Sequence, residues 1–185
     1  LTAEAWMQPG VTPENLAAHQ AVAYKEELPR GKVALVLSAG NVSSIGPMDA
    51  LYKLFVDNEV VVYKTHRVND YLGPLLERGL RPLVEAGFLR VVYGGVEEGA
   101  YLCEHELVDS IHITGSDKTY DAIVFGGGPE GARRKAENRP RLRKPVSSEL
   151  GNVSPLIVVP GTWSDAGIAF QGENVGTMVA NKAGF

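Results

Sequence analysis

The chain has 185 residues, 44% of them hydrophobic, with a single cysteine and a formal net charge of −4. A chain of this size can bury a sizeable core, and its negative charge argues against nucleic acid as the main partner because phosphate binding depends on clustered Lys and Arg. No apolar run approaches the roughly 18 residues of a membrane span and no secretory leader is visible, so we expect a globular cytoplasmic protein without a membrane partner.

Residues 1–30 are expected to form a lead-in segment, with a helical stretch around Glu14–Glu26. From residue 31 onward, short runs of Val, Leu and Ile alternate with helical patterns. The expected strands are 32–38, 59–65, 89–93, 110–114 and 144–148, and the expected helices between them are 47–57, 71–86, 97–105 and 117–125. Continuous apolar strands are typical of parallel strands buried on both faces. The sequence therefore predicts an α/β fold, a Rossmann-like doubly wound parallel sheet over residues 31–150.

The region around the last of these strands is punctuated by glycine and proline. Gly126–Pro129 is expected to stop a helix, and the polar, basic stretch 130–143 is expected to be a solvated surface excursion. Beyond residue 150 the expected elements are a strand at 156–159, a turn at Pro160–Gly161 and a helix from Ser164 or Asp165 to about Val179. Residues 151–185 are thus predicted to begin a second domain, in a piece of a longer polypeptide.

Loops at the carboxyl ends of the strands hold the first candidate site residues, since a doubly wound sheet binds ligands there. Asn41 follows the first expected strand. Its amide could donate a hydrogen bond to an oxyanion, or it could bond within its own turn. Lys64 ends the second strand, where it could reach a ribose or phosphate or extend into solvent.

Two further loops precede expected helices. Gly95 follows the third strand, and Gly115 and Ser116 follow the fourth. A helix N-terminus exposes N–H groups and a partial positive charge, which suit a pyrophosphate. Ser116 equally suits a plain N-cap. Neither loop contains the G-x-G-x-x-G fingerprint.

The stretch from Glu149 to Pro155 reads Glu-Leu-Gly-Asn-Val-Ser-Pro. It places a carboxylate directly before a tight glycine turn, between two strand-like runs. A carboxylate held in this way suggests a general base.

These motifs, in this order and spacing, resemble the cofactor half of the NAD(P)-dependent aldehyde dehydrogenase superfamily. The resemblance covers about residues 31 to 185, and its most specific part is the pair formed by Thr-Gly-Ser116 and Glu149-Leu-Gly. It implies a dinucleotide-binding domain over 31–150 and the incomplete beginning of a catalytic domain over 151–185.

The resemblance also implies roles for individual residues. Lys64 would contact the adenosine ribose of NAD or NADP, Gly95 would let the adenine side approach, and Gly115 and Ser116 would face the pyrophosphate. Glu149 would be the general base that activates water for thioester hydrolysis, and Asn41 would help to hold the oxyanion. Phe185 would lie just before the cysteine nucleophile, which this chain lacks.

Arg67 departs from the family pattern, because an acidic residue that binds the ribose hydroxyls commonly stands three positions after the lysine. A cation at this position would favour a 2′-phosphate, and hence NADP; the alternative is that Arg67 is a surface charge. The neighbours of Asn41 also differ from the usual motif, so its assignment depends on its spacing to Lys64.

The implied function of the full-length protein is oxidation of a small-molecule aldehyde to a carboxylic acid through a cysteine thioester, by a homo-oligomer. One alternative is a dinucleotide-binding fragment without catalysis of its own. Another is the acyl-CoA reductase branch of the same superfamily, to which Gly-Asn-Val-Ser at 151–154 is similar.

Cys103, the sole thiol, is predicted to lie on the apolar face of a helix, next to Glu104. There it would act as a small buried hydrophobe rather than a thiolate. The four histidines lack the spacing of metal ligands, so no metal site is expected.

Overall fold

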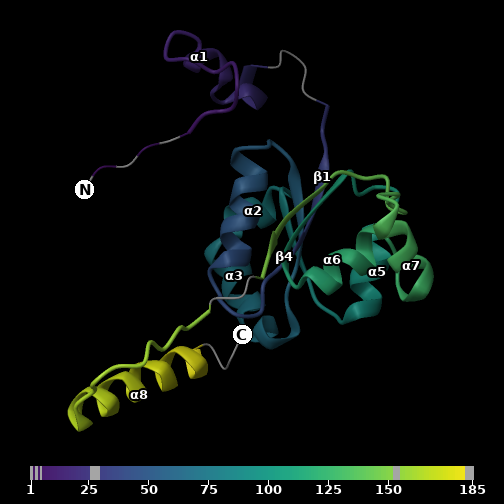
Figure 1. The fold of residues 1–185 in the computed structure, drawn as a ribbon. Helices are drawn as coiled ribbons and strands as arrows, with labels where there is room; N and C mark the ends of the chain where they lie inside the picture. The colour runs from purple at the N-terminus through teal and green to yellow at the C-terminus, as the bar shows by residue number, and fades with distance from the viewer. Residues whose placement is uncertain (1, 3, 5, 26–29, 152–154, 182–185) are drawn as a thin grey trace.

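The computed structural model describes residues 2, 4, 6–25, 30–151 and 155–181 (Figure 1). Within these residues, five strands form one sheet in the order β3-β2-β1-β4-β5, and every neighbouring pair is parallel. The strands are β1 (Val33–Leu37), β2 (Val60–Lys64), β3 (Leu89–Val92), β4 (Ser110–Gly115) and β5 (Val146–Leu150). The predicted α/β fold with a doubly wound parallel sheet is confirmed.

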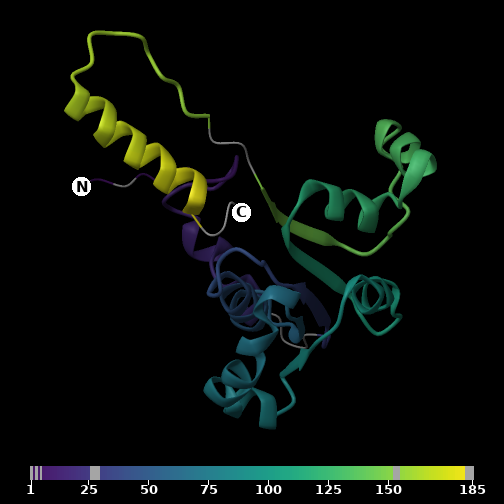
Figure 2. The same cartoon turned by 90° about the horizontal axis from the view of Figure 1, so that it is seen from below.

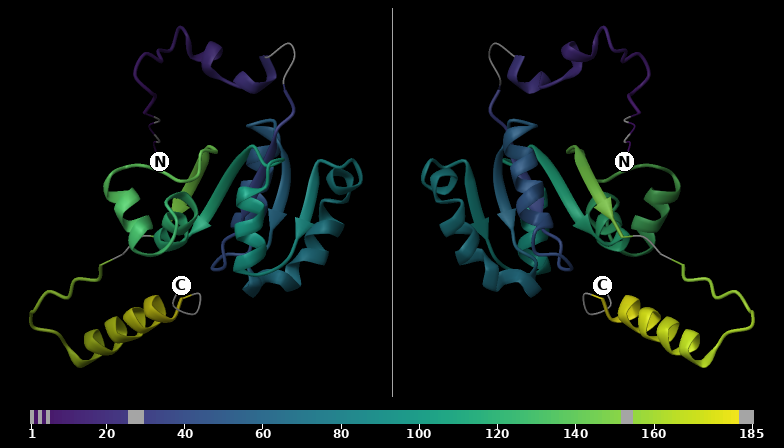
Figure 3. Two further views of the ribbon diagram at one scale, coloured as in Figure 1. Left: turned by 90° about the vertical axis from the view of Figure 1, so that its right-hand side faces the viewer. Right: turned by 90° about the vertical axis from the view of Figure 1, so that its left-hand side faces the viewer.

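Helices cover both faces of the sheet, as Figures 1 and 3 show. One face carries α2 (Ile45–Phe55), α3 (Gly73–Gly79) and α4 (Arg81–Glu85), and the other carries α5 (Val96–Glu104), α6 (Asp117–Val124) and α7 (Gly128–Ala136). The other helices described are α1 (Leu16–His19), the 3₁₀ helices η1 (Val22–Lys25) and η2 (Arg67–Leu72), and α8 (Asp165–Ala180).

The core consists of two hydrophobic clusters, one on each face of β1. Ala34 and Val36 pack with Ala50 of α2, whereas Leu35 packs with Cys103 of α5 and Ile111 of β4. This division follows from the pleat of a strand, which points successive side chains to opposite faces. Ala34, Leu35 and Val36 are all 0% exposed, so β1 is the buried centre of the sheet.

The order of the strands reverses at β1. The chain proceeds outward from β1 through β2 to β3, then returns to place β4 on the other side of β1 and β5 beyond it. Such a reversal opens a crevice at the carboxyl ends of the strands, where doubly wound folds bind ligands. The loops after β1, β2, β3 and β4 therefore lie at the expected ligand-binding edge.

Two predicted helices are broken. The helical stretch expected around 14–26 is interrupted: among the described residues up to 25 it consists of the short elements α1 and η1, with Ala21 between them at a φ of 49°. The helix expected over 71–86 is divided at Leu80 into α3 and α4, and Pro82 lies in the first turn of α4. Proline lacks the N–H that a continuous helix would need there.

The predicted surface excursion at 130–143 begins instead with a helix, α7. Gly126 and Gly128 adopt positive φ values of 90° and 68°, which turn the chain where the helix begins, and Pro129 lies in its first turn. Gly131 packs onto this turn so closely that a Cβ would lie 1.8 Å from the carbonyl oxygen of Gly126. Glu130 forms ion pairs with Arg133 and Arg134 of the next turn. Part of the basic run therefore forms ion pairs within the helix.

The strand expected at 156–159 is also wrong. Residues 155–160 form no helix or strand, and the apolar side chains from Leu156 to Val159 are exposed. A strand requires a neighbour for its backbone groups, and none of the described residues provides one here. Helix α8 confirms the expected helix, and Ser164 caps it by accepting from the N–H of Gly167 at 3.1 Å.

Helix α8 stands away from the sheet in the views of Figures 2 and 3. The division of the chain at residues 30 and 150 stays a prediction. No helix in the described part of the chain is long and apolar enough to cross a membrane.

Candidate functional site

Lys64, the last residue of β2, is held at the carboxyl edge of the sheet. Its side chain is largely buried, because β2 lies between β1 and β3, and the residue is only 8% exposed. Nζ donates a hydrogen bond of 2.7 Å to the carbonyl oxygen of Gly94, in the loop after β3. The ammonium group is therefore fixed beside this loop and does not extend freely into solvent.

The electrostatic surroundings of Lys64 are mixed. Burial lowers the pKa of its ammonium group below the ordinary value, and the nearby guanidinium of Arg67 acts in the same direction. The carboxylates of Asp70 and Glu98 oppose this decrease. The site thus contains two cations and two carboxylates.

Arg67 and Gly95 lie near each other on neighbouring loops. A Cβ built on Gly95 would lie 3.7 Å from Nη1 of Arg67 and 3.6 Å from Oε2 of Glu98. Arg67 is exposed, and among the described residues no carboxylate pairs with its guanidinium within 4 Å. The predicted cofactor residues Lys64, Arg67 and Gly95 are therefore brought together at the ends of β2 and β3.

Glu98 joins this group from the first turn of α5. Its Oε2 accepts a hydrogen bond of 2.6 Å from the N–H of Gly95, the N-cap residue of the helix. Hydrogen bonds from the backbone N–H groups of Glu98 and Gly95 lower the pKa of this carboxyl, and the charges of Lys64 and Arg67 lower it further. The carboxylate thus has a defined position over the glycine loop.

Gly115 and Ser116 lie at the end of β4, as predicted. The Ser116 hydroxyl accepts a hydrogen bond of 3.1 Å from the N–H of Thr119, so Ser116 is the N-cap of α6. A Cβ on Gly115 would meet only the Ile113 side chain at ordinary contact distance, 3.7 Å. Steric crowding therefore does not explain why residue 115 is a glycine.

Asn41 lies exposed in the loop after β1, and its side chain forms no hydrogen bond with the described residues. The loop is braced by Asn69, whose Nδ2 donates to the carbonyl oxygens of Ala39 at 3.0 Å and Gly40 at 3.3 Å. Gly40 is required by close packing, because a Cβ there would lie 2.7 Å from the ring of His66. The loops after β1 and β2 are thus locked together.

Glu149 is the fourth residue of β5, paired in register with Thr114 of β4. Its carboxylate is exposed. Asn41 follows β1, and Glu149 is the penultimate residue of β5. Both therefore lie near the carboxyl ends of strands on either side of β4. Residues 152–154 of the adjoining motif, and Phe185, lie outside the described residues.

Three polar residues of this edge were not predicted from the sequence. Asn69 braces a loop, Asp70 accepts a hydrogen bond from the Thr65 hydroxyl, and Glu98 caps α5. Only Glu98 carries a readable signal, since an acid three residues after a glycine at a helix start is a capping pattern. The positions of Asn69 and Asp70 depend on tertiary packing.

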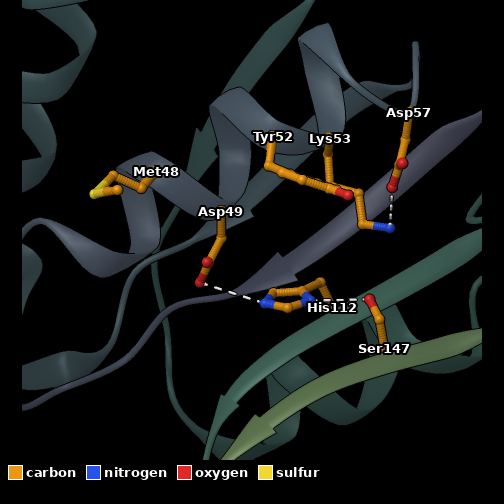
Figure 4. A pocket seen from close by; sticks show the side chains of 7 residues that line it. All are labelled: Met48, Asp49, Tyr52, Lys53, Asp57, His112 and Ser147. Carbon is orange, nitrogen blue, oxygen red and sulfur yellow. Dashed lines mark hydrogen bonds and ion pairs between the residues drawn. The ribbon is translucent and has the colours of Figure 1, made fainter. Parts of the chain in front are cut away.

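A separate polar network lies on the face of the sheet beside α2, around a cavity of about 460 Å³ (Figure 4). His112 of β4 lies between Asp49 of α2, with Nε2 and Oδ2 3.5 Å apart, and Ser147 of β5, with Nδ1 and Oγ 2.9 Å apart. Thr114 also donates to Asp49 at 2.9 Å. These contacts tie α2 to β4 and, through His112, to β5.

Cys103 lies inside the cluster around Leu35, at 3% exposure. Burial raises the pKa of its thiol to about 11. The prediction that Cys103 is a buried residue on the apolar face of a helix is confirmed. Among the described residues, no three His, Cys, Asp or Glu side chains gather as metal ligands would.

Comparison with known proteins identifies one family. The profile of the aldehyde dehydrogenase family matches residues 7–170. Betaine aldehyde dehydrogenase 1 of Oryza sativa subsp. japonica is 39% identical over 87 residues, which are 46% of this chain and 14% of that protein. N-succinylglutamate 5-semialdehyde dehydrogenase of Novosphingobium aromaticivorans is 27% identical over 168 residues, which are 90% of this chain and 31% of that protein.

A solved structure supports the fold. 3,6-Anhydro-L-galactose dehydrogenase, in complex with NAP, superposes with a TM-score of 0.54 at 21% identity, over 83% of this chain and 29% of that chain. The matched segments span less than a third of the length of each of these relatives.

Proposed function

The chain belongs to the aldehyde dehydrogenase family, and we propose that it supplies the site for NAD or NADP in an aldehyde-oxidising enzyme. The observation that carries the proposal is the gathering of Lys64, Arg67 and Gly95 at the ends of β2 and β3. That edge is where doubly wound folds bind ligands.

The residues at this edge fit the adenosine end of a dinucleotide. Gly95 and Gly99 lack side chains beside the two cations. A Cβ on Gly99 would lie 3.6 Å from Cε of Lys64, and one on Gly95 would lie 3.7 Å from Nη1 of Arg67. Larger side chains would extend toward the space that a ribose and its phosphate need.

Lys64 would bind the ribose in this proposal. An ammonium group has three donors. The carbonyl oxygens of Gly94 at 2.7 Å and Thr65 at 3.4 Å accept two of them, which leaves one for a ribose hydroxyl. The N-terminus of α6, with Gly115 and Ser116, would face the pyrophosphate, because its first N–H groups carry a partial positive charge. Ser116 accepts from the N–H of Thr119 and the Asp117 side chain accepts from the N–H of Lys118. The N–H of Asp117 is then the one of the first three without a side-chain acceptor among the described residues.

A bound nicotinamide ring would supply the hydride acceptor for aldehyde oxidation. Glu149 would accept a proton from the water that hydrolyses a thioester, as a general base. Asn41 would donate a hydrogen bond to the substrate oxygen as negative charge develops on it. The exposed side chains of both residues support these roles, because neither is committed to a partner in the described chain.

Cys103 has no catalytic role in this proposal. Its thiol lies within an apolar cluster, and its raised pKa disfavours the thiolate that attacks a carbonyl. The nucleophile would come from polypeptide other than this chain, and aldehyde substrate and homo-oligomeric assembly would be properties of that whole protein.

A second candidate is a dinucleotide-binding protein without turnover. The burial of the sole thiol favours it, since this chain by itself then offers no nucleophile of the required type. The acyl-CoA reductase branch stays a prediction, because its motif includes residues 152–154.

Isothermal titration of NAD and NADP tests the proposed cofactor site. The protein should bind at least one of them, and Lys64→Met should weaken binding by about tenfold or more through loss of a charged hydrogen bond. Lys32→Met is the matched control, because Lys32 is exposed at the opposite end of β1, and its affinity should be unchanged. Absence of binding by either cofactor, with the fold intact by circular dichroism, would refute the proposal.

A further inference from the structure

The proposed ribose subsite contains a carboxylate that the sequence motif does not supply. The position three after Lys64 carries Arg67, so the loop after β2 has a cation where the family commonly has an acid. The structure places Glu98 of α5 across the same space, with its Oε2 3.6 Å from a Cβ built on Gly95 and Arg67 Nη1 3.7 Å from that point. The two opposite charges therefore flank one glycine.

Glu98 is also held in place. The hydrogen bond from the Gly95 N–H fixes Oε2, and this contact leaves Oε1 able to accept from a ligand. Other carboxylates nearby are differently placed. Neither Asp70, which accepts from the Thr65 hydroxyl, nor Glu97 of the first turn of α5 has a side-chain atom within 4 Å of a Cβ built on Gly95.

We infer that Glu98 sets the cofactor preference of this site: its carboxylate accepts a hydrogen bond from the adenosine 2′-hydroxyl of NAD and repels the 2′-phosphate of NADP. The inference depends on the proposed cofactor site. A phosphate monoester carries a charge of about −1.5 to −2 near neutral pH. Arg67 attracts that charge and Glu98 opposes it, so the two residues act in opposite directions on the same phosphate.

The lowered pKa of Glu98 supports this role, because the carboxyl stays ionised at neutral pH. Lys64 and Arg67 both contribute to that decrease, which indicates that the carboxylate lies within their electrostatic reach. A ligand phosphate bound between these cations would lie within reach of Glu98 as well.

Glu98→Gln tests the inference, since glutamine keeps the shape and the capping function while removing the charge. NAD, NADP and the nicotinamide-free pair AMP and 2′,5′-ADP are titrated calorimetrically into the protein and its variants. Glu98→Gln should tighten NADP relative to NAD, and 2′,5′-ADP relative to AMP, by about tenfold. Glu97→Gln removes the same charge one residue away and should leave both ratios within about twofold.

The outcomes separate the two proposals. If neither NAD nor NADP binds the unmodified protein, the cofactor site is wrong and the inference falls with it. If both bind and Glu98→Gln leaves the NADP to NAD ratio unchanged, the cofactor site stands and the inference is overturned. Equal shifts in Glu98→Gln and Glu97→Gln would show a general effect of charge and would overturn it too.

Discussion

The two sides of the sheet differ in how completely their functional residues are built. Around β2 and β3, Lys64 is largely buried and bonded, and Glu98 is fixed by a backbone N–H. At β5, four of the five residues are exposed, including Glu149. Preorganised groups bind a ligand without first being ordered. The proposed site at the ends of β2 and β3 therefore has its groups preorganised, whereas Glu149 is exposed and has no hydrogen-bond partner for its side chain among the described residues.

The same contrast appears in the core. Leu35 of β1 is 0% exposed, and Leu150 of β5 is 36% exposed. We expect Leu35→Ala to lower the free energy of unfolding by about 2–5 kcal/mol because it removes buried contacts and leaves a cavity. Leu150→Ala should cost less than about 1 kcal/mol. Urea denaturation measures both, and equal losses would contradict the contrast.

The substitution Arg67→Glu tests whether cofactor binding depends on the ends of β2 and β3 and not on the region around β5. Loss of a charge-assisted contact to the 2′-phosphate should weaken NADP relative to NAD by about ten- to a hundredfold. Arg143→Glu, an exposed cation just before β5, is the control and should leave this ratio nearly constant. Unchanged NADP affinity in Arg67→Glu, measured by calorimetric titration, would mean that Arg67 is only a surface charge.

The buried thiol of Cys103 predicts a pH dependence of the free energy of unfolding. The pKa of its thiol is about 11 in the folded protein, against an ordinary value of 9.0. Between these values the unfolded chain releases the proton and the folded chain keeps it, so the free energy of unfolding falls as pH rises from about 9 to 11. The thiol's contribution is fully present below pH 9.

The expected size of this decrease is about 1–2 kcal/mol. The measurement is the pH dependence of urea denaturation in the protein and in Cys103→Ala, which removes this contribution while other titrating groups remain. Parallel pH profiles for the two proteins would show that the thiol is not held in a low-dielectric core.

Much of the fold was predictable because buried parallel strands are continuous apolar runs, and β1 to β4 were found in this way. The prediction of a strand at 156–159 is wrong because an apolar run in the sequence does not show whether a neighbouring strand is present to pair with it. The sequence does not predict helix α7 because glycines at 126–128 indicate the stop of a helix, although Pro129 directly after glycines is also typical of a helix start.

Some residues of the candidate site were also predictable from local sequence pattern, and others were not. Lys64, Gly95 and Ser116 were predictable because each ends a strand or begins a helix, and such positions follow from local pattern. Glu98 and Asn69 were not, since their roles depend on which loops pack together in space. Asn41 and Glu149 were assigned by resemblance, and their catalytic roles stay predictions.

A crystal structure of the protein with bound NAD tests most directly whether the ends of β2 and β3 hold the cofactor's adenosine. We predict a ribose hydroxyl at hydrogen-bonding distance, about 2.7–3.2 Å, from Nζ of Lys64, with the Glu98 carboxylate accepting from the 2′-hydroxyl. An adenosine bound elsewhere, for example in the cavity beside His112, would contradict this assignment.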